Sequence, residues 1–321
     1  NVTLDPATYF TDRITPGLQE CDPLIAGRYL CEAIGKRTSS ILGLSLIYDT
    51  LDNRVRPTRG RIVTVNADFA GLGGSVKYGR LRANAAQYWP VGRGFIFSIS
   101  GEGGVIKSFE NRGIAGTDDV RLTDRFYLGE PQMRGFDIRG IGPRVLRKFY
   151  QDIDGNGVVG PNEFSEDRDQ WSDDAIGGKY YYQGRAELEI PLGTGAKELG
   201  LRPSIFMDVG AVWGIRRPTL TDTTAAGAFI PSRDAAGLPY YSVTCNGTTT
   251  TQGYAVAPTH NSATCTATGD GVTALGTTYA FREFFQGNSW KPRLAIGFGF
   301  NWNSPFGPFR LDFAKTLLRH D

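Results

Sequence analysis

The feature that most constrains this chain is an alternation of apolar and polar side chains with a period of two. Between residues 41 and 49, Leu42, Leu44 and Leu46 alternate with Gly43 and Ser45. Successive side chains of a β-strand point to opposite faces, so this pattern predicts a strand with one apolar face. The same period recurs in further segments: 62–70, 80–85, 95–102, 179–190, 201–213, 292–303 and 309–315. The chain is therefore predicted to be all-β, with about eight strands of roughly 8 to 14 residues.

The connections between these segments favour a transmembrane antiparallel β-barrel. Short connections such as 90–94 alternate with two long ones, at about 108–176 and about 215–290. Outer-membrane barrels combine short turns at one end with long loops at the other. Aromatic residues near the strand ends would fit the two interfacial girdles of such a barrel: Tyr48, Tyr88, Trp89, Trp213, Trp290 and Trp302. A soluble β-sandwich or a lipocalin-like barrel shares the alternation and remains the alternative.

The composition argues against several other classes of protein. The 321 residues carry a net charge of +2 without a basic stripe, so no nucleic-acid partner is expected. His260 and His320 are the only histidines, and neither has a Cys or His neighbour at metal-ligand spacing. No nucleophile, base and orienting group stand together in a recognisable pattern, so the chain is not expected to be an enzyme. No run of about 18 apolar residues predicts a membrane-spanning helix.

Four cysteines lie in the aperiodic parts of the chain. Cys21 and Cys31 belong to the N-terminal stretch, and Cys245 and Cys265 lie in residues 217–280, which are rich in Thr, Ala, Gly, Asn and Ser. That composition predicts a surface loop without a core of its own. Three disulfide connectivities are possible, and the short separations favour Cys21 with Cys31 and Cys245 with Cys265. Each link would restrict its unfolded loop by on the order of 3 kcal/mol in the chain-entropy model.

The segment "DIDGNGVVGPNEF" (152–164) matches a calcium-binding loop of the EF-hand type. Five residues would supply its ligands: Asp152, Asp154, Asn156, Val158 and Glu163. Val158 would contribute its backbone carbonyl and the other four their side chains. Gly157 occupies the position where that loop needs a sharp turn. Because only three of these ligands carry a charge, the Ca²⁺ site is expected to be weak. The protein is not expected to require a cofactor. The alternative is a turn-rich loop without an ion, since Asp, Asn and Gly form such turns readily.

Five blocks of sequence, in order along the chain, resemble the BamA-like family of outer-membrane protein assembly insertases. The blocks are "YDTLDNRVRPTRG" (48–60), "RFYLGEPQMRGFDIRGIGP" (125–143), "SDDAIGGKYYYQGRAELEIP" (172–191), "FMDVGAVWG" (206–214) and "NSPFGPFRLDFAK" (303–315). The resemblance implies a barrel of about sixteen strands, of which this chain shows about eight. It also implies preceding POTRA domains, a bacterial outer-membrane location, accessory assembly lipoproteins as partners, and outer-membrane proteins as clients.

With this resemblance, the chain is expected to be a fragment of a longer barrel. Residues 1–40 would be an extracellular loop region, and residues 41–321 would be the barrel strands, with long surface loops at about 108–176 and 215–290. The first and last strands of the complete barrel, where an incoming client strand is thought to pair, would lie outside it.

The family further implies a lock that holds its sixth extracellular loop inside the barrel. Here the signature is Arg134, with Gly135 and Phe136, and its partners would be Asp208 and either Glu187 or Glu189. The strand parity agrees, because all three acids fall on the polar side of their strands. A guanidinium can bond a carboxylate through two parallel hydrogen bonds, which a lysine cannot. Without the resemblance, Arg134 would read as an ordinary loop arginine.

Two other functions stay open at this point. A translocation-module or two-partner secretion transporter of the same superfamily would share the signature. A passive porin or receptor barrel would share the alternation, but it would not need the Arg134 block.

Overall fold

The computed structural model describes residues 3–15, 18–113, 116–192, 200–223, 229–231, 236, 238–256, 258–259, 261–304 and 307–320. The chain divides into two compact units, each assembled from segments far apart in the sequence. The first unit comprises Asn1–Lys36, Leu146–Asp173 and Thr219–Phe284. The second comprises Arg37–Val145, Asp174–Pro218 and Phe285–Asp321.

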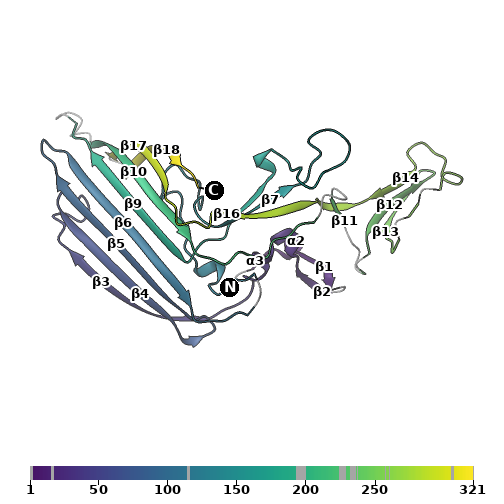
Figure 1. Ribbon diagram of the computed structural model, residues 1–321, viewed down its shortest axis with the longest axis horizontal. Helices are drawn as coiled ribbons and strands as arrows, with labels where there is room; N and C mark the ends of the chain where they lie inside the picture. Colours follow the sequence, from purple (N-terminus) through teal and green to yellow (C-terminus); the bar gives the residue numbers. More distant parts are fainter. Residues whose placement is uncertain are drawn as a thin grey trace. The chain divides into compact units, whose positions relative to one another are not determined.

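The second unit contains one eight-stranded antiparallel sheet, in the order β18-β17-β10-β9-β6-β5-β4-β3 (Figure 1). Its strands are β3 (Ser39–Asp49), β4 (Gly60–Gly74), β5 (Tyr78–Pro90), β6 (Ile96–Ser108), β9 (Tyr180–Glu189), β10 (Leu201–Trp213), β17 (Arg293–Ser304) and β18 (Gly307–Leu318). A short 3-10 helix, η1 (Leu122–Asp124), lies in the connection from β6 to β9. The prediction of eight strands is confirmed, and they run from 10 residues in β9 to 15 in β4.

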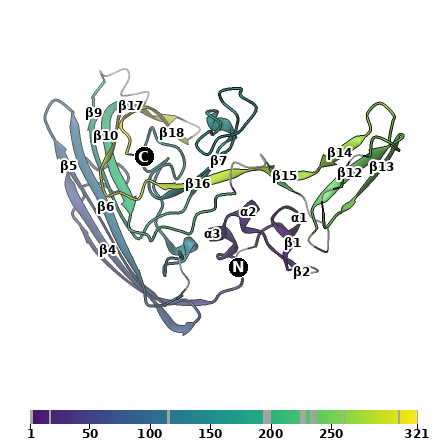
Figure 2. The same ribbon diagram turned by 45° about the vertical axis from the view of Figure 1, so that its right-hand side comes forward.

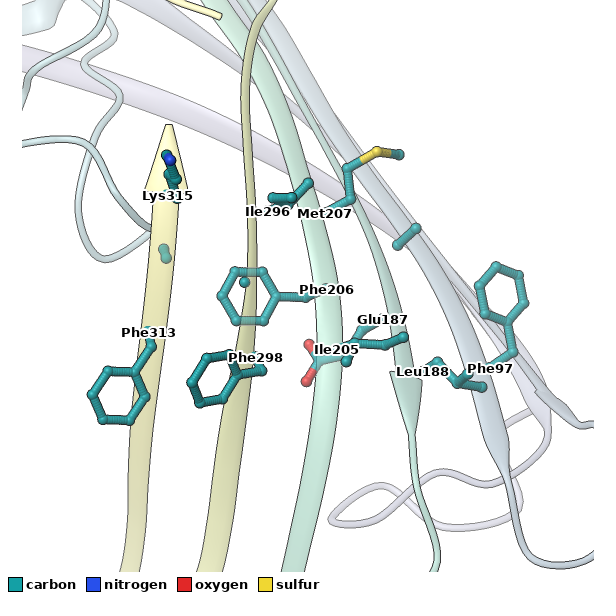
Figure 3. A pocket seen from close by; sticks show the side chains of 13 residues that line it. Phe97, Glu187, Leu188, Ile205, Phe206, Met207, Ile296, Phe298, Phe313 and Lys315 are labelled. Carbon is teal, nitrogen blue, oxygen red and sulfur yellow. The ribbon is translucent and has the colours of Figure 1, made fainter. Parts of the chain in front are cut away.

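The register of the sheet separates an apolar face from a polar face. Phe97, Leu188, Ile205, Phe298 and Phe313 are cross-strand neighbours in one row. Figure 3 shows this row on the sheet, and Ile205, Phe298 and Phe313 are each about half exposed. Exposing such a continuous apolar face to water is unfavourable, whereas the lipid-facing wall of a barrel requires one.

The sheet forms part of a barrel wall and is not closed. Figure 2 shows that it is strongly curved, and β3 and β18 each have a single strand neighbour among the described residues. Charged residues lie on the polar face: Arg80 bonds Asp68 across strands at 3.0 Å, and Arg82 lies 3.9 Å from the same carboxylate. This parity agrees with a polar lumen behind a lipid-facing wall.

The aromatic residues do not all follow the girdle prediction. Trp89 stacks on Phe97 on the apolar face, with ring centroids 5.8 Å apart. Tyr88 is the neighbour of Ser98 instead, so it belongs to the polar face and the prediction for Tyr88 is wrong. Adjacent residues of a strand must face opposite ways, so Tyr88 and Trp89 cannot both reach lipid.

The first unit is made of short elements. They are α1 (Pro6–Tyr9), β1 (Phe10–Thr15), β2 (Leu18–Cys21), α2 (Pro23–Ala26), α3 (Arg28–Cys31), η2 (Arg168–Gln170), β11 (Phe229–Pro231), β12 (Tyr240–Cys245), β13 (Thr248–Gly253), β14 (Gly271–Ala274) and β15 (Gly276–Tyr279). Its described sheets are β1-β2, β11-β15 and β13-β12-β14. The unit also contains most of a further sheet, β16-β7-β8, whose strands are β16 (Phe281–Gln286), β7 (Arg144–Phe149) and β8 (Ser172–Ala175). The sequence did not predict these strands, because each is too short to show a sustained period. No helix in the described part of the chain has the length and hydropathy to cross a membrane.

Candidate functional site

Residues 125–143 of the β6–β9 connection pack against the polar face of the sheet. Leu128, Met133 and Ile141 form a buried cluster with Tyr181 of β9 and Val212 of β10. The segment turns back on itself, because the Ile141 amide donates to the Leu128 carbonyl at 3.0 Å. The loop therefore carries its own apolar anchor to the wall.

Gly135, directly after the signature arginine, permits a close approach to the wall. Its φ of +83° is a left-handed conformation, and a Cβ there would lie 3.1 Å from the Cβ of Ala314. Its carbonyl accepts a hydrogen bond of 2.6 Å from the hydroxyl of Thr316 on β18. A side chain at this position would be strained in its backbone conformation and would press on Ala314 of the wall.

Arg134 makes a two-pronged bond to Asp208 of β10. Its Nε lies 2.7 Å from Oδ2 and its Nη2 lies 2.8 Å from Oδ1, and its backbone amide also donates to Oδ2 at 3.2 Å. The Asp208 side chain is fully buried, and that of Arg134 is 7% exposed. The guanidinium also lies over the Phe206 ring, 3.2 Å from its centroid. Charge-assisted, bidentate bonding in such a site is strong and fixes orientation.

The pair belongs to a balanced cluster of three arginines and three carboxylates. Arg185 of β9 donates to Asp208 at 2.8 Å, because the register places these two residues opposite each other. Arg310 of β18 reaches Glu187 at 3.0 Å and Asp312 at 2.7 Å. The Nη1 of Arg134 lies between these acids, 3.7 Å from Glu187 and 3.6 Å from Asp312. These six residues, Arg134, Arg185, Arg310, Glu187, Asp208 and Asp312, are called the anchor cluster below.

The structure distinguishes between the two glutamates that the sequence left open. Glu187 lies in the cluster and accepts a hydrogen bond from Ser204 at 2.7 Å. Glu189 does not take part, so its assignment to the lock is corrected: it pairs with Arg202 at 3.3 Å. The two glutamates are on the same face, but two residues along a strand is about 6.6 Å, beyond the reach of a single contact. Phe136 packs against the buried cluster around Leu128.

Three members of the cluster were not assigned to the lock from the sequence. Arg310 and Asp312 lie in "FRLDFAK", where the alternation with Phe309, Leu311 and Phe313 already places them on the polar face. Arg185 precedes the apolar series Ala186 and Leu188, so alternation places it on the polar face too, but alternation does not pair it with Asp208. Parity could indicate the face, but pairing these residues required the register between strands.

A second charged contact holds the start of the same connection. The Asp118 carboxylate accepts bonds from Lys179 Nζ at 3.0 Å, the Arg216 amide at 2.8 Å and the Val120 amide at 2.9 Å. Burial would raise the pKa of Asp118, but these donors outweigh it and hold the pKa below its usual value. Asp118 therefore clips the loop base to the residues that precede β9 and follow β10.

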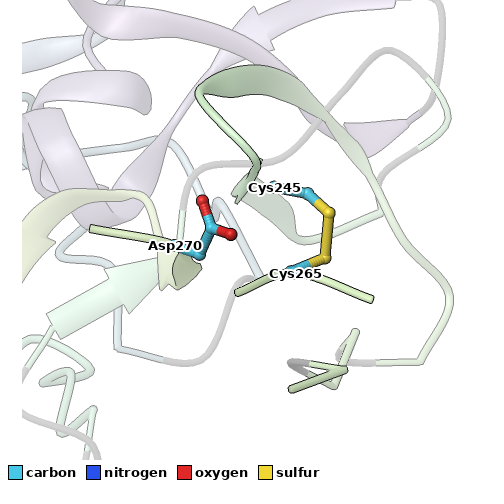
Figure 4. A group of neighbouring side chains, drawn as sticks. All are labelled: Cys245, Cys265 and Asp270. Atoms are coloured by element: carbon cyan, nitrogen blue, oxygen red, sulfur yellow. A yellow bond between two sulfur atoms is a disulfide. The ribbon is translucent and has the colours of Figure 1, made fainter. Parts of the chain in front are cut away.

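The cysteines form the two disulfides, Cys21–Cys31 and Cys245–Cys265. Asp270 lies near the second one (Figure 4), but both sulfur atoms are bonded to each other, so this group offers no thiolate to a metal. In the predicted calcium loop, Asp152, Asp154 and Glu163 place one oxygen each within 4.8 Å of one another. Asp152 accepts from the amides of Gly155 and Gly157, both at 2.8 Å.

The curved antiparallel wall, apolar on one face and carrying a loop anchored by buried charge on the other, is part of a membrane β-barrel with a loop fixed on its polar face. Comparison with known proteins agrees. Residues 13–321 match the model of the Omp85 superfamily domain, and the chain belongs to this superfamily.

Individual relatives are distant and longer than this chain. The outer membrane protein assembly factor BamA of Neorickettsia risticii is 26% identical over 285 residues, which cover 88% of this chain and 26% of that protein. A SAM50-like protein of Drosophila melanogaster is 33% identical over 112 residues, 35% of this chain and 24% of that protein. The crystal structure of BamA from Haemophilus ducreyi lacking POTRA domains 1–3 matches 87% of this chain and 39% of its own, at 18% identity and a TM-score of 0.49. The chain thus spans about a quarter of the length of the two sequence relatives.

Proposed function

We propose that this chain is part of the central subunit of an outer-membrane β-barrel assembly machinery, which folds and inserts other barrel proteins. Membership of the Omp85 superfamily and the similarity to an assembly factor support this proposal. The single observation that carries it is the Arg134–Asp208 pair, which fastens a long loop to the polar face of the wall. The Arg134 block is part of the resemblance to assembly insertases, whereas a passive porin would share only the alternation of the strands.

The proposed activity forms and breaks no covalent bond, so the protein is not proposed to be an enzyme. Its clients would be unfolded outer-membrane proteins, and its partners would include accessory assembly lipoproteins and the lipid bilayer. The proposed location is the bacterial outer membrane, as the name of the BamA relative indicates. The similarity to a SAM50-like protein of an animal supports an assembly role in general more than this location.

The anchor cluster would contribute by keeping residues 125–143 against the wall while the barrel edge engages a client. Because Asp208 and Glu187 belong to neighbouring strands and Asp312 to β18, the loop ties several strands together. Releasing the arginine would leave three acids facing two arginines, which favours loop departure from the wall.

The test is reconstitution of the complete protein into lipid vesicles, followed by addition of a urea-unfolded reporter barrel. The expected result is faster reporter folding than in empty vesicles, measured by heat-modifiable mobility on gels. The Arg134→Ala protein, inserted at the same density, is the control. Ion conductance without any acceleration of reporter folding would instead identify a passive porin.

A further inference from the structure

The turn between β3 and β4 uses its own polar side chains to fix its shape. Asp52 accepts hydrogen bonds from the amides of Thr58 and Arg59 and from the Thr58 hydroxyl, at 2.9, 3.1 and 2.5 Å. The bond from the Thr58 hydroxyl has the largest effect on the Asp52 carboxyl, and together the bonds lower its pKa to about 2. Asn53 accepts from the amides of Val55 and Arg56, at 2.8 and 2.9 Å. The turn is therefore preorganised, with its acidic and amide groups used internally.

The side chains left at the tip of this turn are an apolar one and a cation. Val55 is 88% exposed. The guanidinium of Arg56 has no hydrogen-bond or ion-pair partner among the described residues, whereas that of Arg54 is bonded to Asp49 at 2.9 Å. The tip of the turn thus presents an exposed valine beside an arginine that a carboxylate of a partner could meet.

The neighbouring turn, between β5 and β6, presents a second cation under strain. Arg93 has a φ of +48° between Gly92 and Gly94, a left-handed conformation in which glycine or asparagine would be relaxed. Its guanidinium likewise has no partner in the described part of the chain. An arginine in this conformation costs free energy that glycine or asparagine at the same place in the turn would not.

A groove of about 700 Å³ connects the two turns at the short-turn end of the sheet. Three arginines line it, Arg56, Arg93 and Arg202, against one carboxylate, Glu189, which pairs with Arg202. Apolar side chains, among them Phe95, Ile96 and Ile190, supply the rest of the lining. Among its described lining residues, the groove thus combines an apolar floor with two arginines, Arg56 and Arg93, that no described carboxylate pairs with.

We propose that this groove is a docking site for an acidic polypeptide segment of a partner protein, with an apolar side chain as its anchor. Charge complementarity selects the acidic partner, because the turn's own acids, Asp49 and Asp52, are already engaged. A lipid surface fits less well. The groove includes Ile96, Glu189 and Arg202, which belong to the polar face, opposite the apolar row that faces lipid.

The test is a binding measurement with the complete protein in detergent. The probe is a fluorescent peptide of alternating glutamate and leucine, compared with one of alternating lysine and leucine. Binding of the acidic peptide should weaken about tenfold in Arg56→Glu/Arg93→Glu, and the basic peptide should gain affinity for that variant. Val55→Ser should weaken the acidic peptide about threefold without changing its salt dependence. All three positions are exposed, so heat-modifiable mobility should stay normal and show intact barrels.

The matched control is Lys291→Glu, an equal charge reversal of an exposed residue at the other end of the sheet, which should leave peptide binding unchanged. Equal binding of both peptides, or equal losses in Lys291→Glu and the double variant, would overturn the proposal. A third result would also overturn the proposal: the protein binds phosphatidylglycerol vesicles through Arg56 and Arg93 but does not bind the acidic peptide. The two arginines would then be a lipid-binding site. The measurement is of binding alone, so its failure leaves the proposed assembly function untouched.

Discussion

Two arginines that are mostly buried, one in each unit, are held by the same kinds of partner in different surroundings. Arg134 in the second unit lies over Phe206 and bonds Asp208, and Arg147 in the first lies 3.9 Å from the centroid of the Phe281 ring and bonds Glu283 at 2.9 Å. Both acids are almost fully buried. Burial of a charge is tolerated in each place because a planar cation and an aromatic ring replace water.

The surroundings differ in what else supports the pair. Asp208 receives a second arginine, and the cluster extends over β9, β10 and β18. Arg147 instead donates to two backbone carbonyls, of Leu24 at 2.7 Å and Ile25 at 3.2 Å, within the N-terminal segment that Cys21–Cys31 closes. The first arrangement attaches a loop to a hydrogen-bonded wall, and the second holds together short segments that have little core. Removing the Arg134 side chain should therefore impair function, whereas removing the Arg147 side chain should only destabilise the structure around it.

The largest effect is expected for Arg134→Ala and Asp208→Ala in the complete protein. Breaking a buried pair from one side typically costs about 3 to 5 kcal/mol, so residues 125–143 should leave the wall. Reporter barrel assembly should fall strongly, and the loop should become sensitive to added protease. Because both changes remove one shared interaction, the double variant should be little worse than either single one.

Additive defects in that cycle would show that the two residues act independently. Glu189→Gln is the matched control on the same face, since Glu189 pairs with Arg202 outside the anchor cluster, and assembly should stay near that of the parent protein.

Arg147→Ala tests the structural role of the arginine in the first unit. The variant should lose about 3 kcal/mol of local stability, because the buried Glu283 carboxylate loses its cation. Among the described residues, the carboxylate would then accept a hydrogen bond only from the Thr221 amide, at 2.9 Å. Faster amide hydrogen exchange is expected in α2 (Pro23–Ala26), with reporter assembly retained. Assembly lost to the same degree as in Arg134→Ala would remove the functional difference between the two arginines.

Asp118→Asn should have a smaller effect on the loop base. The change removes the charge that Lys179 meets, worth about 1.5 to 3 kcal/mol for a hydrogen bond to a charged group. The pKa of Asp118 is lowered in the folded state, so its contribution is complete above the ordinary carboxyl pKa and is lost as pH falls through the lowered pKa. Protease sensitivity of residues 109–124 should thus rise in acid for the parent protein, and at neutral pH already for the variant. Identical acid profiles of the two would exclude Asp118 as the titrating group.

The smallest structural effect is expected for Glu163→Gln. If the 152–163 loop binds Ca²⁺ with Asp152, Asp154, Asn156, Val158 and Glu163 as ligands, this change removes its bidentate ligand and should abolish the heat of Ca²⁺ binding in calorimetry. Barrel mobility on gels should not change, because the loop belongs to the first unit and not to the sheet. Absence of any Ca²⁺ heat in the parent protein at millimolar ion would leave the segment as a turn-rich loop.

The strand content of the second unit was predictable because alternation is a local property. Leu42, Leu44 and Leu46 indicate both a strand and its apolar face, and the structure confirms them as exposed on β3. The short strands β12 to β14 were not predictable, since four to six residues of mixed Thr, Ser and Val show no decisive period.

The fold class, the superfamily resemblance and the face on which each charged residue lies could be read from the sequence, since parity within a strand follows from backbone geometry alone. The folded structure was needed to show that Glu187 and not Glu189 reaches Arg134, that Arg185 shares Asp208, and that Arg310 and Asp312 complete the cluster. Contacts between the loop and the wall join residues up to 181 positions apart, as Thr316 and Gly135 are. They depend on the register between strands and on the course of a loop, which arise from packing and not from any local pattern.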